Sequence, residues 1–179
     1  MALAATVYVI AAFWVDLPPY GIWLEEARSQ VRLQGSTAHV SVELSYRCSS
    51  WRPRGTVLYL PFSRADGLGP AREVRAEVEE GWTWEAFPDG VLLRLRMAPE
   101  ARGRARFSFS QDCPTGVFRL PFPVTKGWSR PPSPARWTVL APPQVIADIT
   151  PRPLARMQDP GGRWQVEGTT DTELQIRWR

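Results

Sequence analysis

The residues of this chain best suited to chemistry are two cysteines and a single histidine. Cys48 and Cys113 are the only cysteines in 179 residues, and His39 is the only histidine. A cysteine can serve as a nucleophile, a metal ligand, half of a disulfide or a small buried side chain. Each use belongs to a different kind of protein, so the choice depends on the elements that position these residues.

The lone histidine excludes most histidine-dependent catalysis. Zinc and copper sites of the histidine-rich kinds need two or three imidazoles. A Ser-His-Asp triad would need His39, and no serine stands in a Gly-x-Ser-x-Gly motif. Cys48 and His39 fall on opposite faces of one predicted strand, which argues against a Cys-His pair. We therefore expect no enzyme, no metal and no cofactor.

Carboxylates leave one catalytic alternative open. A glycoside hydrolase needs only two acids at a suitable separation. The sequence context marks none of the candidates, and acids beside turns commonly form the turn itself. These candidates are Asp66, Glu79, Glu80, Glu85, Asp89 and Asp112.

Apolar and polar residues alternate along much of the chain, which predicts β-strands. In STAHVSVELSYRC, every second residue from Ala38 to Cys48 is apolar, and His39 lies on the polar side. A Pro-Asp-Gly sequence at 88–90 predicts a hairpin turn. About seven short strands within residues 27–111, without helical periodicity, predict an all-β fold: an antiparallel β-sandwich of immunoglobulin-like architecture.

The chain divides into four predicted segments. Residues 1–15 are apolar and fit either a secretion signal or a strand that assembles with a neighbour; they are too short for a stable membrane span. Residues 27–111 form the sandwich core. Residues 112–161 hold eleven of the 18 prolines, which predicts a proline-rich extension packed on the core. Residues 162–179 predict a terminal β-hairpin.

Cys48 ends one predicted strand and Cys113 follows another. We predict a disulfide between them, which would stabilise the fold by about 4 kcal/mol in the chain-entropy model and requires an oxidising compartment. The alternative is two unrelated buried thiols. The spacing resembles that of the inter-sheet disulfide of immunoglobulin domains. Those domains carry a tyrosine two residues before the second cysteine, where this chain has Gln111, so we expect the architecture without the family.

Nine tryptophans include the candidate binding residues. Trp51 stands beside Arg52, and Trp128 lies between Lys126 and Arg130, so each ring neighbours a cation in a predicted loop. Such pairs suit contact with a protein partner or an acidic glycan. The alternative is that each ring covers one end of the core.

Trp82 and Trp84 fall on one face of a predicted strand. They could form a flat platform on which sugar rings stack. Their alternation with Val74, Val78 and Leu93 favours the core instead.

Charge and motif content favour a role in binding or assembly. The net charge of +4 is spread among acids instead of gathered in a basic patch, so we expect no nucleic-acid partner. Together these features predict a non-enzymatic, extracytoplasmic β-sandwich, secreted or at the cell surface, that binds a protein partner or self-assembles by strand addition. The alternative function is polysaccharide binding through exposed tryptophans.

Overall fold

Thirteen strands make up the described part of the chain. The computed structural model describes residues 21–49, 52–62, 68–121, 135–142, 146–158, 162–170 and 173–179. The strands are β1 (Ile22–Gln34), β2 (Thr37–Cys48), β3 (Arg54–Pro61), β4 (Arg72–Val78), β5 (Thr83–Phe87), β6 (Gly90–Met97), β7 (Arg102–Asp112), β8 (Val117–Pro121), β9 (Ala135–Ala141), β10 (Ile146–Thr150), β11 (Ala155–Gln158), β12 (Trp164–Thr170) and β13 (Glu173–Trp178).

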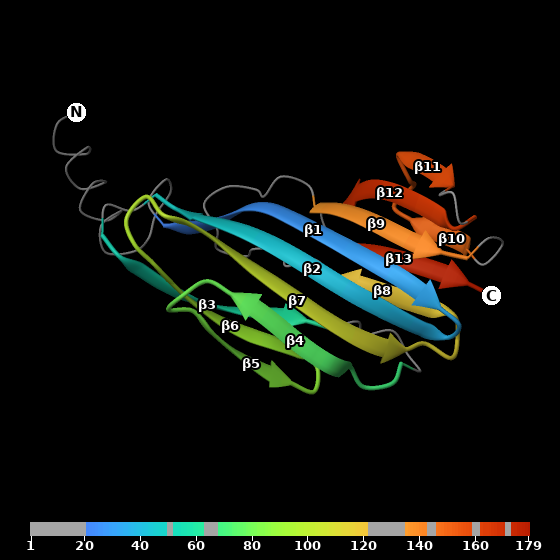
Figure 1. Ribbon diagram of the computed structural model, residues 1–179, viewed down its shortest axis with the longest axis horizontal. Helices are drawn as coiled ribbons and strands as arrows, with labels where there is room; N and C mark the ends of the chain where they lie inside the picture. The colour runs from blue at the N-terminus through green and yellow to red at the C-terminus, as the bar shows by residue number, and fades with distance from the viewer. Residues whose placement is uncertain are drawn as a thin grey trace, which may run out of the picture.

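The strands form one large sheet and two small ones (Figure 1). The large sheet has the order β11-β12-β9-β1-β2-β7-β4, and the small sheets have the orders β10-β13-β8 and β3-β6-β5. The small sheets pack against the large one, so the predicted all-β sandwich is confirmed. No helix that could cross a bilayer occurs in the described ranges.

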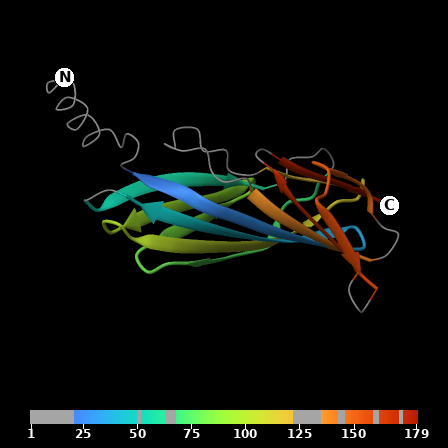
Figure 2. The same ribbon diagram turned by 90° about the horizontal axis from the view of Figure 1, so that it is seen from above.

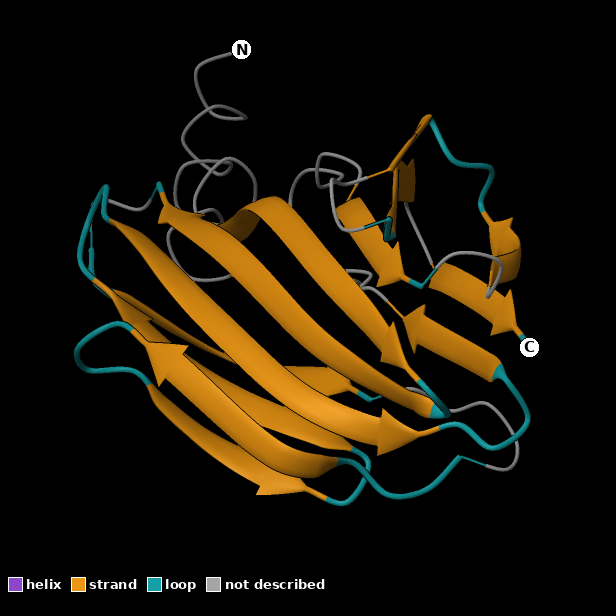
Figure 3. Cartoon of the chain, turned by 45° about the vertical axis from the view of Figure 1, so that its right-hand side comes forward, coloured by secondary structure: helices purple, strands orange, loops and turns teal. Residues whose placement is uncertain are grey.

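The long β1–β2 hairpin, continued by β7, is the centre of the large sheet (Figure 3). Along β2, the apolar residues at alternate positions from Ala38 to Cys48 face the core, as predicted, because neighbouring side chains of a strand point to opposite faces. The turn between β1 and β2 places Gly35 at φ +58°, a conformation that favours glycine.

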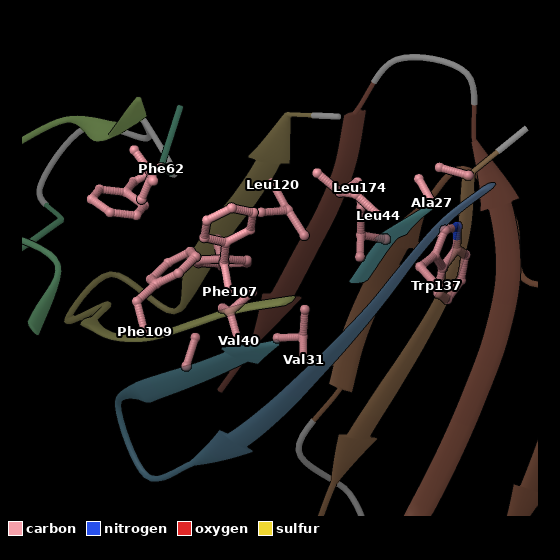
Figure 4. Close-up of a cluster of buried hydrophobic side chains, with 14 of the residues drawn as sticks. Ala27, Val31, Val40, Leu44, Phe62, Phe107, Phe109, Leu120, Trp137 and Leu174 are labelled. Atoms are coloured by element: carbon pink, nitrogen blue, oxygen red, sulfur yellow. The ribbon is translucent and has the colours of Figure 1, made fainter. Parts of the chain in front are cut away.

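The core lies between the two layers (Figure 4). Val31, Val40 and Phe107 from the large sheet meet Leu120 and Leu174 from β8 and β13, and all five are buried. Burying each such side chain stabilises the fold by about 1.5–3 kcal/mol.

The proline-rich segment contributes strands to the sandwich itself. ARWTVLA forms β9 and IADIT forms β10. β9 lies inside the large sheet, parallel to β1, with Arg28 opposite Arg136, and brings the buried Trp137 into the core. This parallel pair is a departure from the purely antiparallel arrangement that we predicted.

The predicted terminal hairpin is wrong. β12 pairs with β9 and β11 in the large sheet, whereas β13 pairs with β8 and β10 in a small one. Val166, Leu174, Ile176 and Trp178 are buried and Trp164 is half-buried, so the alternation of apolar residues indicates which side chains face inward. It does not identify the neighbouring strand. Figure 2 shows these C-terminal strands gathered at one end of the molecule.

Candidate functional site

The two cysteines lie at opposite ends of β2. Cys48 is the last residue of β2 and pairs with Ile22. Cys113 donates its backbone N–H to the Ser36 carbonyl, 2.7 Å away, immediately before Thr37 begins the strand. The twelve residues of β2 place these ends roughly 35 Å apart at about 3.3 Å per residue. A disulfide needs a Cα separation of about 6 Å.

Both cysteines are free and buried, so the predicted disulfide is wrong. The disulfide was predicted because each cysteine lies at the end of a strand. Because β7 runs antiparallel to β2, it carries Cys113 to the start of β2, whereas Cys48 lies at the end of β2. Desolvation raises the pKa of the Cys113 thiol to about 11, so the thiol is protonated at neutral pH. A protonated, buried thiol is a poor nucleophile.

The predicted loop contacts fall mostly outside the described residues. Arg52 is described and exposed. Trp51, Lys126, Trp128 and Arg130 lie outside the described ranges, and their grouping stays a prediction.

Trp82 is a core residue. Its indole Nε1–H donates to the Arg96 carbonyl over 3.0 Å, and its ring meets the Tyr46 ring edge-on at a centroid distance of 5.9 Å. Trp84 also faces the inner side, opposite Leu93, but it is 37% exposed because β5 is an edge strand. The two rings therefore offer no shared exposed platform for sugars.

The outer face of the large sheet carries a polar trough of about 410 Å³ around His39. Strand pairing builds it, because Arg32, His39 and Ser110 stand opposite one another on β1, β2 and β7. A second row places Gln30 opposite Ser41 and Ser41 opposite Ser108, with Arg75 of β4 next to Ser108. We name this surface the His39 trough.

His39 belongs to a chain of hydrogen bonds. Its Nδ1 lies 2.9 Å from Ser110 Oγ, and that hydroxyl donates to Glu73 Oε2 over 3.2 Å. A hydroxyl has one proton, so Ser110 accepts from His39 Nδ1–H. In a hydrolytic triad the serine donates to the histidine, which is the reverse. The network orients the imidazole and leaves Nε2 without a partner among the described residues.

A β-bulge in β4 brings Glu73 to this network. The β4–β7 register shifts between Arg72 and Arg75, and Glu73 has φ +54°. A non-glycine residue in the left-handed region is strained by about 1–3 kcal/mol, and such residues and bulges concentrate near functional sites. No glycine, proline or asparagine in REVRAEV signals the bulge, so sequence reasoning missed it.

The rest of this face is an ion-pair ladder. Arg106 lies 3.4 Å from Glu43 and 3.6 Å from Glu77, and Arg102 lies 3.1 Å from Glu25. Arg102 and Arg106 are thus paired with carboxylates of other strands of the sheet, whereas Arg104 and Arg136 of the same face have no ion-pair partner among the described residues.

Arg32 and Arg75 differ from the arginines of the ladder. Both are exposed at the His39 trough. No carboxylate of the described ranges lies within ion-pair distance of either. With respect to the described residues, the N–H donors of both guanidinium groups are thus available to an incoming anion.

The opposite layer exposes an apolar surface. On the outer side of the β3-β6-β5 sheet, Val57 is 54% exposed, Tyr59 40% and Phe87 39%. Leu92 of β6 stands opposite Tyr59 and is half-buried. We name Val57, Tyr59, Phe87 and Leu92 the outer apolar face.

No protein-family model and no curated protein matches this sequence. Several solved structures share the fold. A candidate nutrient-binding protein from Legionella pneumophila matches with a TM-score of 0.61 and 8% identity, over 88% of this chain and 66% of its own. The chain is thus a β-sandwich of a kind found within longer proteins.

The longer proteins include M1 zinc metallopeptidases. A two-domain M1 zinc metallopeptidase bound to L-tryptophan matches with a TM-score of 0.52 and 14% identity, over 90% of this chain and 44% of its own. An M1 zinc metallopeptidase from Deinococcus radiodurans bound to a Tyr-Ser-Ala substrate matches with a TM-score of 0.51 and 15% identity, over 88% of this chain and 42% of its own. This chain therefore spans less than half of each peptidase, and identities this low establish the fold alone.

Proposed function

We propose that this chain is a non-enzymatic β-sandwich module that docks onto another folded protein through its outer apolar face. The observation that carries the proposal is the exposure of Val57, Tyr59 and Phe87 on one sheet face. Single exposed apolar residues are ordinary, but a contiguous apolar surface on a soluble domain marks an interaction site.

Polar residues lie next to the outer apolar face, just as a polar rim surrounds the apolar centre of many protein–protein interfaces. Arg94 and Arg96 continue β6 beyond Leu92 on the same side. Arg94 lies 3.9 Å from Glu85 of β5. An apolar centre with a polar rim is the usual composition of a docking surface, and two arginines favour a partner with acidic residues around its own apolar contact.

The structural neighbours support a companion role. The sandwich matches only part of the two-domain M1 peptidase, whose remaining chain lies outside the match. A module of this fold thus occurs beside another domain, and its surface must then include a face for that domain.

The hydrogen-bond direction at His39 supports a non-catalytic role, because Ser110 donates to Glu73 and accepts from the imidazole. The raised pKa of Cys113 argues against a catalytic thiol, because a protonated thiol is a poor nucleophile.

The proposal of an extracytoplasmic location is supported by the apolar residues 1–15 alone, since free thiols require no oxidising compartment. The intact mass of the protein from its own source tests whether those residues are removed.

Strand addition is a second route to assembly. β5 lies at the edge of its sheet, and all five of its residues are exposed, so its backbone can pair with an incoming strand. Residues 1–15 are the apolar segment proposed for that pairing. If they form the contact, deleting them converts multimers of the chain into monomers.

Native complex size tests the docking proposal. In extracts of the source cells, the wild-type chain should migrate well above its own 20.2 kDa. Val57→Lys should migrate at the size of the chain alone, because a charge replaces the apolar contact. Arg28→Gln on the opposite layer is the control and should leave the complex unchanged. A wild-type chain that migrates alone, or a Val57→Lys variant that keeps the full complex, would contradict the proposal.

A further inference from the structure

We propose that the His39 trough binds a small hydroxyl-rich anion: a sugar acid or a sugar phosphate. This site goes beyond the docking function and is independent of it, because the trough lies on the outer side of the large sheet and the outer apolar face on the opposite layer.

Arg32 and Arg75 supply the positive charge. They stand on β1 and β4, three strand spacings apart, which is about 14 Å between backbones at about 4.8 Å per spacing. Long arginine side chains can therefore converge over the trough from both sides. A guanidinium with no carboxylate partner among the described residues can bind a carboxylate or phosphate in bidentate fashion.

Uncharged polar groups line the floor between the two arginines. Gln30, Ser41 and Ser108 stand in one row across β1, β2 and β7. Each offers both a donor and an acceptor. This supply of paired donors and acceptors matches a ligand with several hydroxyl groups better than a simple inorganic anion.

His39 adds an oriented acceptor. Because Ser110 holds the proton on Nδ1, the neutral ring has its lone pair on Nε2, where it can accept from a ligand hydroxyl. Glu73 fixes this arrangement from the strained bulge of β4. The positive charges of Arg32 and Arg75 and the negative charge of Glu73 sum to one net positive charge in the trough. The strain at Glu73 thus serves a preorganised site.

Calorimetric titration of the full chain tests the proposal with four probes: glucuronate, glucose 6-phosphate, glucose and inorganic phosphate. Glucuronate, glucose 6-phosphate or both should bind in the millimolar range or tighter, and the result distinguishes a carboxylate from a phosphate source. Glucose and inorganic phosphate should each bind at least about tenfold more weakly, because each lacks half of the recognised chemistry.

Matched variants localise the binding. Arg32→Gln and Arg75→Gln should each weaken it by about tenfold or more. Arg28→Gln is the control on the same face, because Arg28 is already paired with Glu26 at 2.8 Å, and it should leave the affinity unchanged. Thermal melts verify that the three variants are folded.

Three results would overturn the site. The first is no heat from any probe at about 10 mM ligand, a concentration that should reveal millimolar affinity. The second is inorganic phosphate that binds as tightly as the sugar anions, which would remove the role of the hydroxyl groups. The third is an equal loss of affinity in Arg28→Gln, which would show an unspecific charge effect. None of these results bears on docking through the outer apolar face.

Discussion

The ring of Tyr59 on β3 lies over Gly90 on β6. A Cβ on Gly90 would fall 2.7 Å from the Tyr59 Cζ and 2.6 Å from the Leu60 carbonyl oxygen, closer than real Cβ contacts. The missing side chain at Gly90 thus leaves space for the phenol end of the Tyr59 side chain. The outer apolar face depends on this relationship.

Gly90→Ala should therefore destabilise the protein by about 1–3 kcal/mol, because the new methyl group meets a backbone carbonyl that cannot move freely. Urea unfolding measures the change. Gly69→Ala is the matched control, since its nearest neighbour would be Asp112 Cβ at an ordinary 3.5 Å. Equal stabilities of the two variants would contradict the position of the Tyr59 ring.

Residues of the outer apolar face should matter little for folding. Val57→Lys should change the free energy of unfolding by less than about 0.5 kcal/mol, because more than half of this side chain is already exposed to water. Leu93→Ala, at a fully buried position of the same sheet, should lose about 2–5 kcal/mol. If Val57→Lys unfolded the protein as Leu93→Ala does, the surface would be part of the core and not a docking face.

The thiols provide a test of the strand register. Thiol titration should find both Cys48 and Cys113 free in the unfolded chain and neither reactive in the folded one, because both are buried. Mass spectrometry before and after reduction should show no change. A Cys48–Cys113 bond would require the ends of β2 to meet and would contradict the sheet.

Alkaline pH should weaken the fold through Cys113. Its pKa rises from 9.0 to about 11 on folding, because burial disfavours the thiolate. Between these values the folded thiol keeps its proton while the unfolded one loses it, so stability is full below pH 9 and falls as pH rises. The slope is about 1.4 kcal/mol per pH unit.

Tyr46, whose pKa burial also raises, adds a loss of the same sign at higher pH. Cys113→Ala should therefore flatten the decline of stability between pH 9 and about pH 11, whereas Tyr46 should contribute from about pH 10 upward and dominate only above about pH 11. An unchanged decline in Cys113→Ala would contradict burial as the cause of the raised pKa.

Alternation predicted the fold well where one face of a strand is buried. The inward residues of β2, β9 and β13 follow directly from their period of two. Strand partners did not follow, because neighbours in a sheet are set by contacts distant in sequence. The predictions of the terminal hairpin and of the disulfide were both wrong for that reason. β12 and β13, adjacent in the chain, belong to different sheets, and Cys48 and Cys113 lie at opposite ends of β2.

The candidate sites were largely invisible in the sequence. The His39 trough combines residues from β1, β2, β4 and β7, and only the sheet order brings them together. His39 was identified as a polar-face residue, but the partner Glu73 depends on a bulge without a sequence signal. The outer apolar face was missed because the residues of VLYLPF (57–62) are apolar at successive positions, so alternation does not indicate which of them face outward.

Site-specific photo-crosslinking in the source cells tests the central claim most directly. We would place p-benzoylphenylalanine at Val57 and at Phe87 on the outer apolar face, and at Arg28 on the opposite layer as control. Docking predicts the same single protein adduct from Val57 and Phe87 and none from Arg28; an adduct with a second copy of the chain would mean assembly. Absence of an adduct at Val57 and Phe87, or an equal one at Arg28, would contradict docking through this face.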